Sequence, residues 1–278
     1  MSDPLILRLA AAVSAIAPGA LLLAYFSYSH AWRGIRELTW IAFGLGFTAA
    51  IPIAGVASLF TPSFSSIADL HLYAIAVAFL EASLPEEIGK ILVIYYFLLR
   101  HEDVRRPLDV VALSIVVSLG FASIENIYYV FGSADWSGTA MVRAVTAIPM
   151  HSTMGIIMGY YGAQYLTATR SKRRSLLLMF LWPTVLHGLY DYPVFAVQRL
   201  YDNAQGLAEA EALEFQIVFI MAIVATGLVA VHAVRSLTKT PAYLAALPLG
   251  NGAASGPSAR SDAPSLSPAA RNVAGSGD

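Results

Sequence analysis

The stretch that decides the fold is LDVVALSIVVSLGFASIENIYYVF, residues 108–131. At a rise of about 1.5 Å per residue it is long enough, as a helix, to cross the ~30 Å hydrocarbon core of a bilayer. A carboxylate, Glu125, interrupts its apolar part, and an ionisable group at membrane depth costs at least ~2.5–3.5 kcal/mol. The stretch therefore predicts a transmembrane helix whose charged group serves a function.

The composition of the whole chain favours lipid as its solvent. Of its 278 residues, 57% are hydrophobic and 13% are charged, whereas soluble domains carry about 25% charged residues. A formal net charge of −1 provides no basic surface for nucleic acid, which we exclude as a partner. The chain has no cysteine, and this excludes disulfides, thiolate metal sites and a cysteine nucleophile.

Seven apolar runs of roughly membrane-spanning length follow one another along the chain. They cover residues 5–27, 39–61, 68–99, 108–131, 140–167, 175–199 and 214–235. The first is longer than the apolar part of a signal peptide, so we expect it to be retained as a span. The third has Pro85 in its middle, which predicts a kink or a restart of the helix there.

The loop charges predict the orientation of these spans. Lys and Arg concentrate in the loops at 28–38, 100–107 and 168–174 and in the segment after 235, and the loops between them carry almost none. Because cytoplasmic loops are the basic ones, we expect about seven spans, with the N-terminus outside and the C-terminus inside. The predicted fold is an all-α polytopic transmembrane bundle over residues 1–245.

Residues 246–278 differ from the rest of the chain. They are rich in Ala, Gly, Ser and Pro and show no periodicity. Such a segment has too little apolar bulk to offset its conformational entropy, so a disordered cytoplasmic tail is predicted.

The ionisable residues inside the runs fall at similar depth on four different predicted helices. They are Glu81, Glu86, Glu87 and Lys90 in the third run, Glu125 in the fourth, His151 in the fifth, and His187 and Asp191 in the sixth. Because such groups are costly in lipid, they indicate a polar site in the interior of the bundle.

Spacing relates several of these residues to one another. Glu86 and Lys90 are four residues apart and share a helix face, so the lysine can orient the carboxylate. His187 and Asp191 have the same spacing, in which a carboxylate fixes the tautomer of an imidazole. Gly155, four residues after His151, and Gly159, four further on, would let another helix approach the histidine face closely.

Two histidines and several carboxylates without thiols suit a zinc ion that keeps an open position for water. Such an ion lowers the pKa of water towards ~7, and a carboxylate can accept the proton as the water attacks a carbonyl. We expect Glu125, His151 and His187 to hold zinc. Either Glu86 or Glu87 would be the base, and Lys90 and Asp191 would complete the catalytic group. At mid-membrane the natural substrate is an amide in the membrane segment of another protein.

At these residues the sequence resembles the PrsW family of intramembrane proteases, relatives of the type II CAAX prenyl endopeptidases. Pro85-Glu86-Glu87-Ile88-Gly89-Lys90 is similar to the family's E-E-x-x-K motif, and Phe121-Ala122-Ser123-Ile124-Glu125-Asn126 to its F-x-x-x-E-N motif. His151 with Gly155, and His187 with Asp191, match the third and fourth motifs, so the resemblance covers about 85–191. It implies a multi-pass protein of a bacterial inner membrane that makes the first cut in a single-span protein such as an anti-sigma factor.

Two other functions are compatible with the same residues. A non-catalytic membrane scaffold of this fold could retain them for structural reasons. A transporter of protons or divalent cations also uses buried carboxylates as relays, although the sequence has no paired short segments of the inverted-repeat kind.

Overall fold

The computed structural model describes residues 4–104, 106–168, 170–202 and 209–239, and their regular secondary structure is entirely helical. These residues belong to one compact unit, Met1–Ala246. The predicted tail at 246–278 lies outside the described residues, so its disorder stays a prediction.

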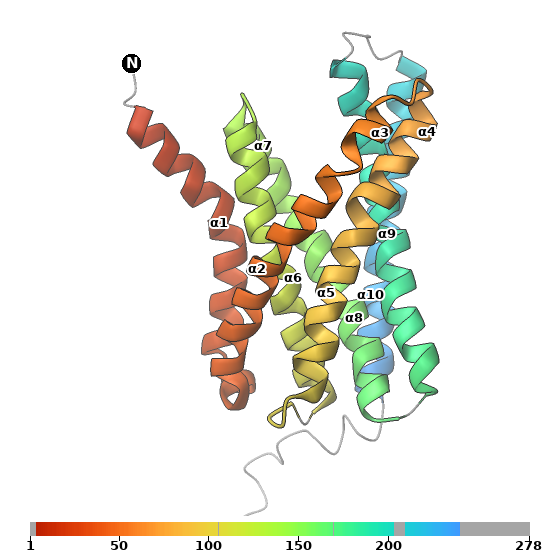
Figure 1. The fold of residues 1–278 in the computed structure, drawn as a ribbon. Coiled ribbons are helices and arrows are strands. Elements are labelled where there is room, and N and C mark those ends of the chain that lie inside the picture. The colour runs from red at the N-terminus through yellow and green to blue at the C-terminus, as the bar shows by residue number, and fades with distance from the viewer. Residues whose placement is uncertain (1–3, 105, 169, 203–208, 240–278) are drawn as a thin grey trace, which may run out of the picture. The chain divides into compact units, whose positions relative to one another are not determined.

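The helices follow the predicted runs (Figure 1). In chain order they are α1 (Pro4–Tyr28), η1 (His30–Ile35), α2 (Arg36–Ser58), α3 (Thr61–Ser65), α4 (Leu70–Ile75), η2 (Ala76–Ser83), α5 (Leu84–Tyr96), η3 (Leu98–Arg100), α6 (Pro107–Gly132), α7 (Trp136–Val145), α8 (Ala147–Leu166), α9 (Lys172–Asp202) and α10 (Glu209–Thr238). Five of the seven predicted runs correspond to single helices. The third run corresponds to α4, η2, α5 and the start of η3, and the fifth to α7 and α8.

Helix α6 lies at the centre of the bundle. Pro107 occupies its first turn, where a missing N–H costs nothing, and the Asp109 carboxylate accepts a hydrogen bond from the backbone N–H of Arg106 (3.0 Å). In the most apolar part of α6, 83% of the residues are buried, against 17% in α1 and in α2. Helix α6 packs against α1, α2 and α8, so Glu125 is presented to the interior of the bundle.

Glycines allow α6 to pack closely against α8, as the sequence predicts. A Cβ atom at Gly155 would lie 2.6 Å from the Cα of Ile115, and one at Gly159 would lie 2.5 Å from the Cα of Val111. Neither position has room for a methyl group. The two backbones therefore meet directly, which fixes the height of His151 on α8 relative to Glu125 on α6.

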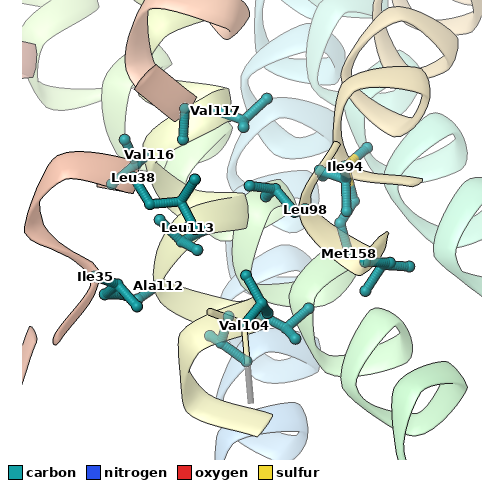
Figure 2. Packing of buried hydrophobic residues seen from close by; sticks show 14 of the residues in the cluster. Ile35, Leu38, Ile94, Leu98, Val104, Ala112, Leu113, Val116, Val117 and Met158 are labelled. Carbon is teal, nitrogen blue, oxygen red and sulfur yellow. The ribbon is translucent and has the colours of Figure 1, made fainter. Parts of the chain in front are cut away.

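The largest apolar cluster among the described residues joins α1, α2, α5, η3, α6, α8 and α9 (Figure 2). Ile94, Leu98, Leu113, Val117 and Met158 are fully buried in it. On α6, Leu113 and Val117 precede Glu125 by two turns or more. The cluster therefore supports the polar site from one side.

The third predicted run is interrupted where its glutamates begin. Residues Ala76–Ser83 form a π-helix, and α5 starts at Leu84 with Pro85 in its first turn. This confirms the restart predicted at Pro85, whose ring nitrogen cannot donate to the preceding turn. The π-helix was not predicted; wide turns of this kind are common at functional sites.

The fifth predicted run is also divided, because the structure has two helices, α7 and α8, within it; that the run crosses the membrane once stays a prediction. Helix α7 ends at Val145, and α8 begins at Ala147 after Thr146, whose φ of −119° and ψ of −63° depart from helical values. Pro149 explains the break, because it has no N–H to donate to the carbonyl of Val145.

Among the described residues, four helices are long and apolar enough to cross a membrane. They are Leu5–Tyr28, Arg36–Ser58, Pro107–Gly132 and Ala212–Ser236. The remaining runs are interrupted or more polar, and these contain most of the predicted site residues. Seven crossings therefore remain a prediction, as does the orientation.

The basic segments gather at one end of the bundle. Figure 1 shows the α1–α2, α5–α6 and α8–α9 connections at the same end as the C-terminal end of α10. These are the segments in which the sequence concentrates Lys and Arg. The arrangement is the one that the loop charges predict for a cytoplasmic face.

Candidate active site and metal centre

The structure brings all seven predicted site residues together from four helices. Glu86, Glu87 and Lys90 come from the start of α5, Glu125 from α6, His151 from α8, and His187 and Asp191 from α9. Residues 100 positions apart in sequence are hydrogen-bonded here. The site is therefore a product of the tertiary fold.

Four of these side chains are completely enclosed. Glu87, Lys90, His151 and His187 each expose at most 1% of their surface. Glu86 and Glu125 are partly exposed, with 13% and 19% of their side chains accessible. Asp191 is similarly accessible, at 14%. Among the three site glutamates, Glu86 and Glu125 are open enough to meet a substrate, and this separates their roles from that of the enclosed Glu87.

Lys90 connects the glutamates of α5 to the histidine of α8. Its Nζ donates to Glu87 Oε1 at 2.7 Å and to Glu86 Oε2 at 3.4 Å. It also lies 3.0 Å from Nδ1 of His151 and 4.6 Å from the centre of the Phe121 ring. An ammonium group can only donate, so Nδ1 of His151 accepts this hydrogen bond. The predicted pairing of Lys90 with Glu86 is present, but the shorter contact is with Glu87.

His187 lies between carboxylates on both sides of its ring. Its Nδ1 is 2.6 Å from Glu87 Oε1, and its Nε2 is 3.2 Å from Asp191 Oδ2 and 3.9 Å from Glu86 Oε2. The predicted pairing with Asp191 is confirmed. If Nδ1–H donates to Glu87, the lone pair on Nε2 faces two groups that can only accept. This arrangement requires a positive group, a proton or a cation, beside Nε2.

Glu125 is held by a residue that the sequence analysis missed. Its Oε1 lies 3.2 Å from Nη2 of Arg143, and Nε of Arg143 donates to Asn126 Oδ1 at 2.7 Å. The guanidinium also lies 4.2 Å from the centre of the Tyr129 ring. Arg143 could have been found from its charge, which lies inside the apolar run at 140–167.

The second oxygen of Glu125 is close to His151 but poorly aligned with it. Oε2 lies 2.8 Å from Nε2 of His151, yet this buried oxygen has no partner in hydrogen-bonding geometry. Oε2 of Glu87 is also buried without a partner. Unpaired carboxylate oxygens in an enclosed site are costly unless a cation, a water molecule or a substrate N–H meets them.

The donor atoms fit a metal ion, with one difference from the predicted ligand set. Glu86, His151 and His187 each offer an atom within 4.8 Å of the other two. Carboxylate oxygen and imidazole nitrogen are ligands that zinc accepts. The predicted set contained Glu125 in place of Glu86, and Glu125 also lies beside the histidines, with Oε2 2.8 Å from Nε2 of His151. The ligand set therefore stays a prediction.

A cleft leads from the surface of the bundle to the two partly exposed glutamates. Its volume is about 350 Å³. It is lined by α2 residues Ala50, Ile51, Ile53, Ala54 and Ala57, by α6 residues Phe121, Ile124, Glu125, Ile127 and Tyr128, and by Glu81 and Glu86. Its walls are mainly apolar, and the carboxylates Glu86 and Glu125 both lie within it.

Sequence comparison matches residues 35–231 to a family described as PrsW family intramembrane metalloprotease. The protein named Protease PrsW from Geobacillus kaustophilus is 34% identical over 186 residues, which cover 66% of this chain and 79% of that protein. The Bacillus subtilis Protease PrsW is 30% identical over 186 residues, covering 66% and 82%. The Clostridioides difficile Protease PrsW is 37% identical over 122 residues, covering 42% and 51%. No solved structure matches the chain significantly.

Proposed function

The chain belongs to the PrsW family of intramembrane metalloproteases and is a multi-pass membrane protein, and from this premise we propose that it uses zinc to hydrolyse a peptide bond within or near the membrane segment of another membrane protein. The observation that carries the proposal is the convergence of Glu86, His151 and His187 within 4.8 Å. The resemblance of its motifs supports a single-span protein such as an anti-sigma factor as the substrate.

We assign the zinc ligands to Glu86, His151 and His187. To bind the ion through Nε2, His151 would carry its ring proton on Nδ1, so its present contact with the Lys90 ammonium (3.0 Å) would have to change on binding. When bound, zinc supplies Lewis-acid chemistry, which polarises a carbonyl group and makes water acidic enough to attack it at neutral pH. The hydrogen bond between Glu87 and Nδ1 of His187 (2.6 Å) would fix the tautomer in which Nε2 is free to bind the ion. Glu87 is then a positioning residue, because it is fully buried and engaged with Lys90.

Glu125 is the better candidate for the general base. Its Oε2 has no hydrogen-bond partner, and its side chain lines the cleft. Arg143 lies 3.2 Å from Oε1, and Oε2 accepts no well-aligned hydrogen bond although it lies 2.8 Å from Nε2 of His151. Oε2 would accept a proton from the attacking water and return it to the leaving amine nitrogen. This assignment exchanges the roles that the sequence alone suggested for Glu86 and Glu125.

Metal content combined with cleavage tests these roles. The purified full-length protein, in liposomes, would be incubated with single-span peptides that carry an apolar segment of about 20 residues, and the products identified by mass spectrometry. Glu86→Gln should lose both zinc and cleavage, whereas Glu125→Gln should lose cleavage and retain zinc. Glu37→Gln, on the exposed first turn of α2, is the matched control. Wild-type protein without stoichiometric metal that still cleaves would overturn the zinc mechanism.

The orientation belongs to the same proposal: seven spans, the N-terminus outside and the C-terminus in the cytoplasm of a bacterial cell. The clustering of basic connections at one end of the bundle supports it. Reporter fusions after residue 240 should behave as cytoplasmic, and fusions within 200–213 as external. A cytoplasmic 200–213 segment would contradict the count of spans.

A further inference from the structure

We propose that a locally unwound stretch of the substrate enters sideways through the cleft between α2 and α6, and that the alanines of α2 form a pocket for a bulky apolar side chain next to the scissile bond. This inference rests on the proposed function and adds the route and the side-chain preference.

The cleft begins where two glycines stop holding α2 and α6 together. A Cβ atom at Gly46 would collide with the carbonyl of Val117, and one at Gly120 would collide with the carbonyl of Phe43. The two backbones touch there and leave no room for a ligand. Within about one turn of this contact, Ala50 and Ile124 already line the open volume. The cleft is thus closed at one end by direct backbone packing.

The mouth of the cleft lies on a surface that would face lipid. Ile51 on α2 and Tyr128 on α6 line it, and they expose 58% and 76% of their surface. Only 17% of the residues in the apolar part of α2 are buried, so α2 forms an outer wall of the bundle. A membrane segment can therefore reach the cleft from within the bilayer without passing through water.

The volume of the cleft favours an unwound chain over an intact helix. A helix about 10–12 Å wide with a rise of 1.5 Å per residue fills about 140 Å³ per residue. A cleft of about 350 Å³ therefore holds two or three residues, less than one helical turn. An extended segment also frees its carbonyl group, which in a helix is already hydrogen-bonded.

The polar groups of the cleft favour a peptide over a lipid chain. Glu125 Oε2 lies 2.8 Å from Nε2 of His151 but accepts no well-aligned hydrogen bond, and an acyl chain offers no donor to it. An extended peptide carries an N–H at each residue, which can donate to this oxygen, and a carbonyl beside Glu86. The occupant that satisfies both the apolar walls and the carboxylates is a peptide with apolar side chains.

The shape of the α2 wall indicates the preferred side chain. Ala50, Ala54 and Ala57 are spaced as neighbours on one helix face and all line the cleft. Ile53 also lines the cleft, but its side chain packs against α5, where a Cβ atom at Gly89 would lie 2.8 Å from it. Small residues on this wall leave space that a Leu or Phe side chain of the substrate can fill.

Enlarging one alanine tests the pocket. The substrates are single-span peptides in which Gly, Ala, Leu or Phe occupies each central position in turn. We expect the wild type to favour Leu or Phe next to the cut. Ala54→Phe should lower their cleavage at least about tenfold, while cleavage of the Gly and Ala peptides stays within about threefold. Val56→Phe adds the same ring to an exposed α2 position outside the cleft and should change neither. Equal rates for all peptides in Ala54→Phe, at the wild-type level or uniformly reduced, would overturn the pocket.

Cross-linking separates this inference from the proposed function. The chain has no cysteine, so Ala54→Cys and Val56→Cys can each be introduced singly and joined to a cysteine in the peptide by a short bifunctional reagent. Capture at residue 54 exceeding that at 56 supports the cleft even if no hydrolysis occurs, in which case the proposed function fails alone. Hydrolysis by the wild type with equal or weaker capture at 54 overturns the cleft and leaves the proposed function standing.

Discussion

Helix α10 and the segment formed by α4, η2 and α5 differ in how their backbone and polar groups are accommodated in a bilayer. Helix α10 is apolar and uninterrupted, only 22% of the residues in its apolar part are buried, and it contributes none of the predicted site residues. The α4–η2–α5 segment changes to a π-helix, restarts at Pro85 and carries three site residues within one turn and a half. An outer helix pairs all its backbone groups by itself, whereas irregular backbone and charge are tolerated in a membrane only where protein surrounds them.

This difference indicates where substitutions should affect activity or stability. Substitutions in the enclosed segments should abolish peptide cleavage or destabilise the bundle. Equivalent substitutions on the outer helices should change neither activity nor stability appreciably.

Loss of Glu125, the general base that we propose, should have the largest effect. Glu125→Gln is expected to lower the cleavage rate by about 10²–10⁴-fold because the amide cannot accept the proton. Cleavage is measured by mass spectrometry of a single-span peptide. Glu214→Gln, on α10, should keep the wild-type rate. A Glu125→Gln variant as active as the wild type would assign the base elsewhere.

Removal of the metal should stop cleavage and also weaken the fold. An ion held by α5, α8 and α9 cross-links three helices, and at a thousandfold excess over its Kd it stabilises the folded state by about 4 kcal/mol. A chelator should therefore lower both Tm and activity, and zinc should restore both.

Two histidine variants provide the contrast for metal removal. His151→Ala should resemble the stripped protein and no longer respond to chelator. His232→Ala, on the exposed face of α10, should respond as the wild type does. An unchanged Tm after chelation of an enzyme that loses activity would show that the ion does not stabilise the bundle.

Loss of Arg143 should have an intermediate effect through Glu125. Arg143→Met is expected to lower kcat about 10–100-fold with little change in KM or zinc content, because the ligands stay in place while the base loses its support. Arg143→Lys should restore only part of the rate, since a lysine cannot bridge Glu125 and Asn126 as the guanidinium does. Arg170→Met, in the exposed connection before α9, is the control. A loss of zinc in Arg143→Met would contradict a role confined to Glu125.

A packing change should affect stability more than chemistry. Gly159→Val places a side chain against the α6 backbone and is expected to cost about 1–3 kcal/mol. Gly227→Ala, on α10, meets nothing within 4 Å and should leave stability unchanged or raise it by up to about 1 kcal/mol. Thermal unfolding of the two variants measures the contrast, and equal Tm values would contradict the central position of α6.

Deletion of residues 247–278 should have the smallest effect. The predicted tail is too poor in apolar residues to pack against the bundle, so expression, Tm and cleavage should match those of the full chain. A clear loss of Tm would show that this segment binds the helices.

The sequence alone determined the positions of the helices and of their costly charges. Both depend on properties read along the chain: about 20 apolar residues span a bilayer, and a carboxylate in such a run stands out because lipid penalises it. Local spacing also predicted the pair of His187 with Asp191, since residues four apart share a helix face.

Only the tertiary structure decided which groups meet across helices. Three features depend on how far one helix is shifted along another: the grouping of Glu86 with His151 and His187, the enclosure of Glu87, and the contact of Glu125 with Arg143. Backbone contacts at Gly155, Gly159 and the Gly46–Gly120 region set those shifts. The sequence shows where such glycines are but not which residues they contact. Hydropathy and helical periodicity describe one helix at a time, whereas the distance between two helices depends on how they pack in three dimensions.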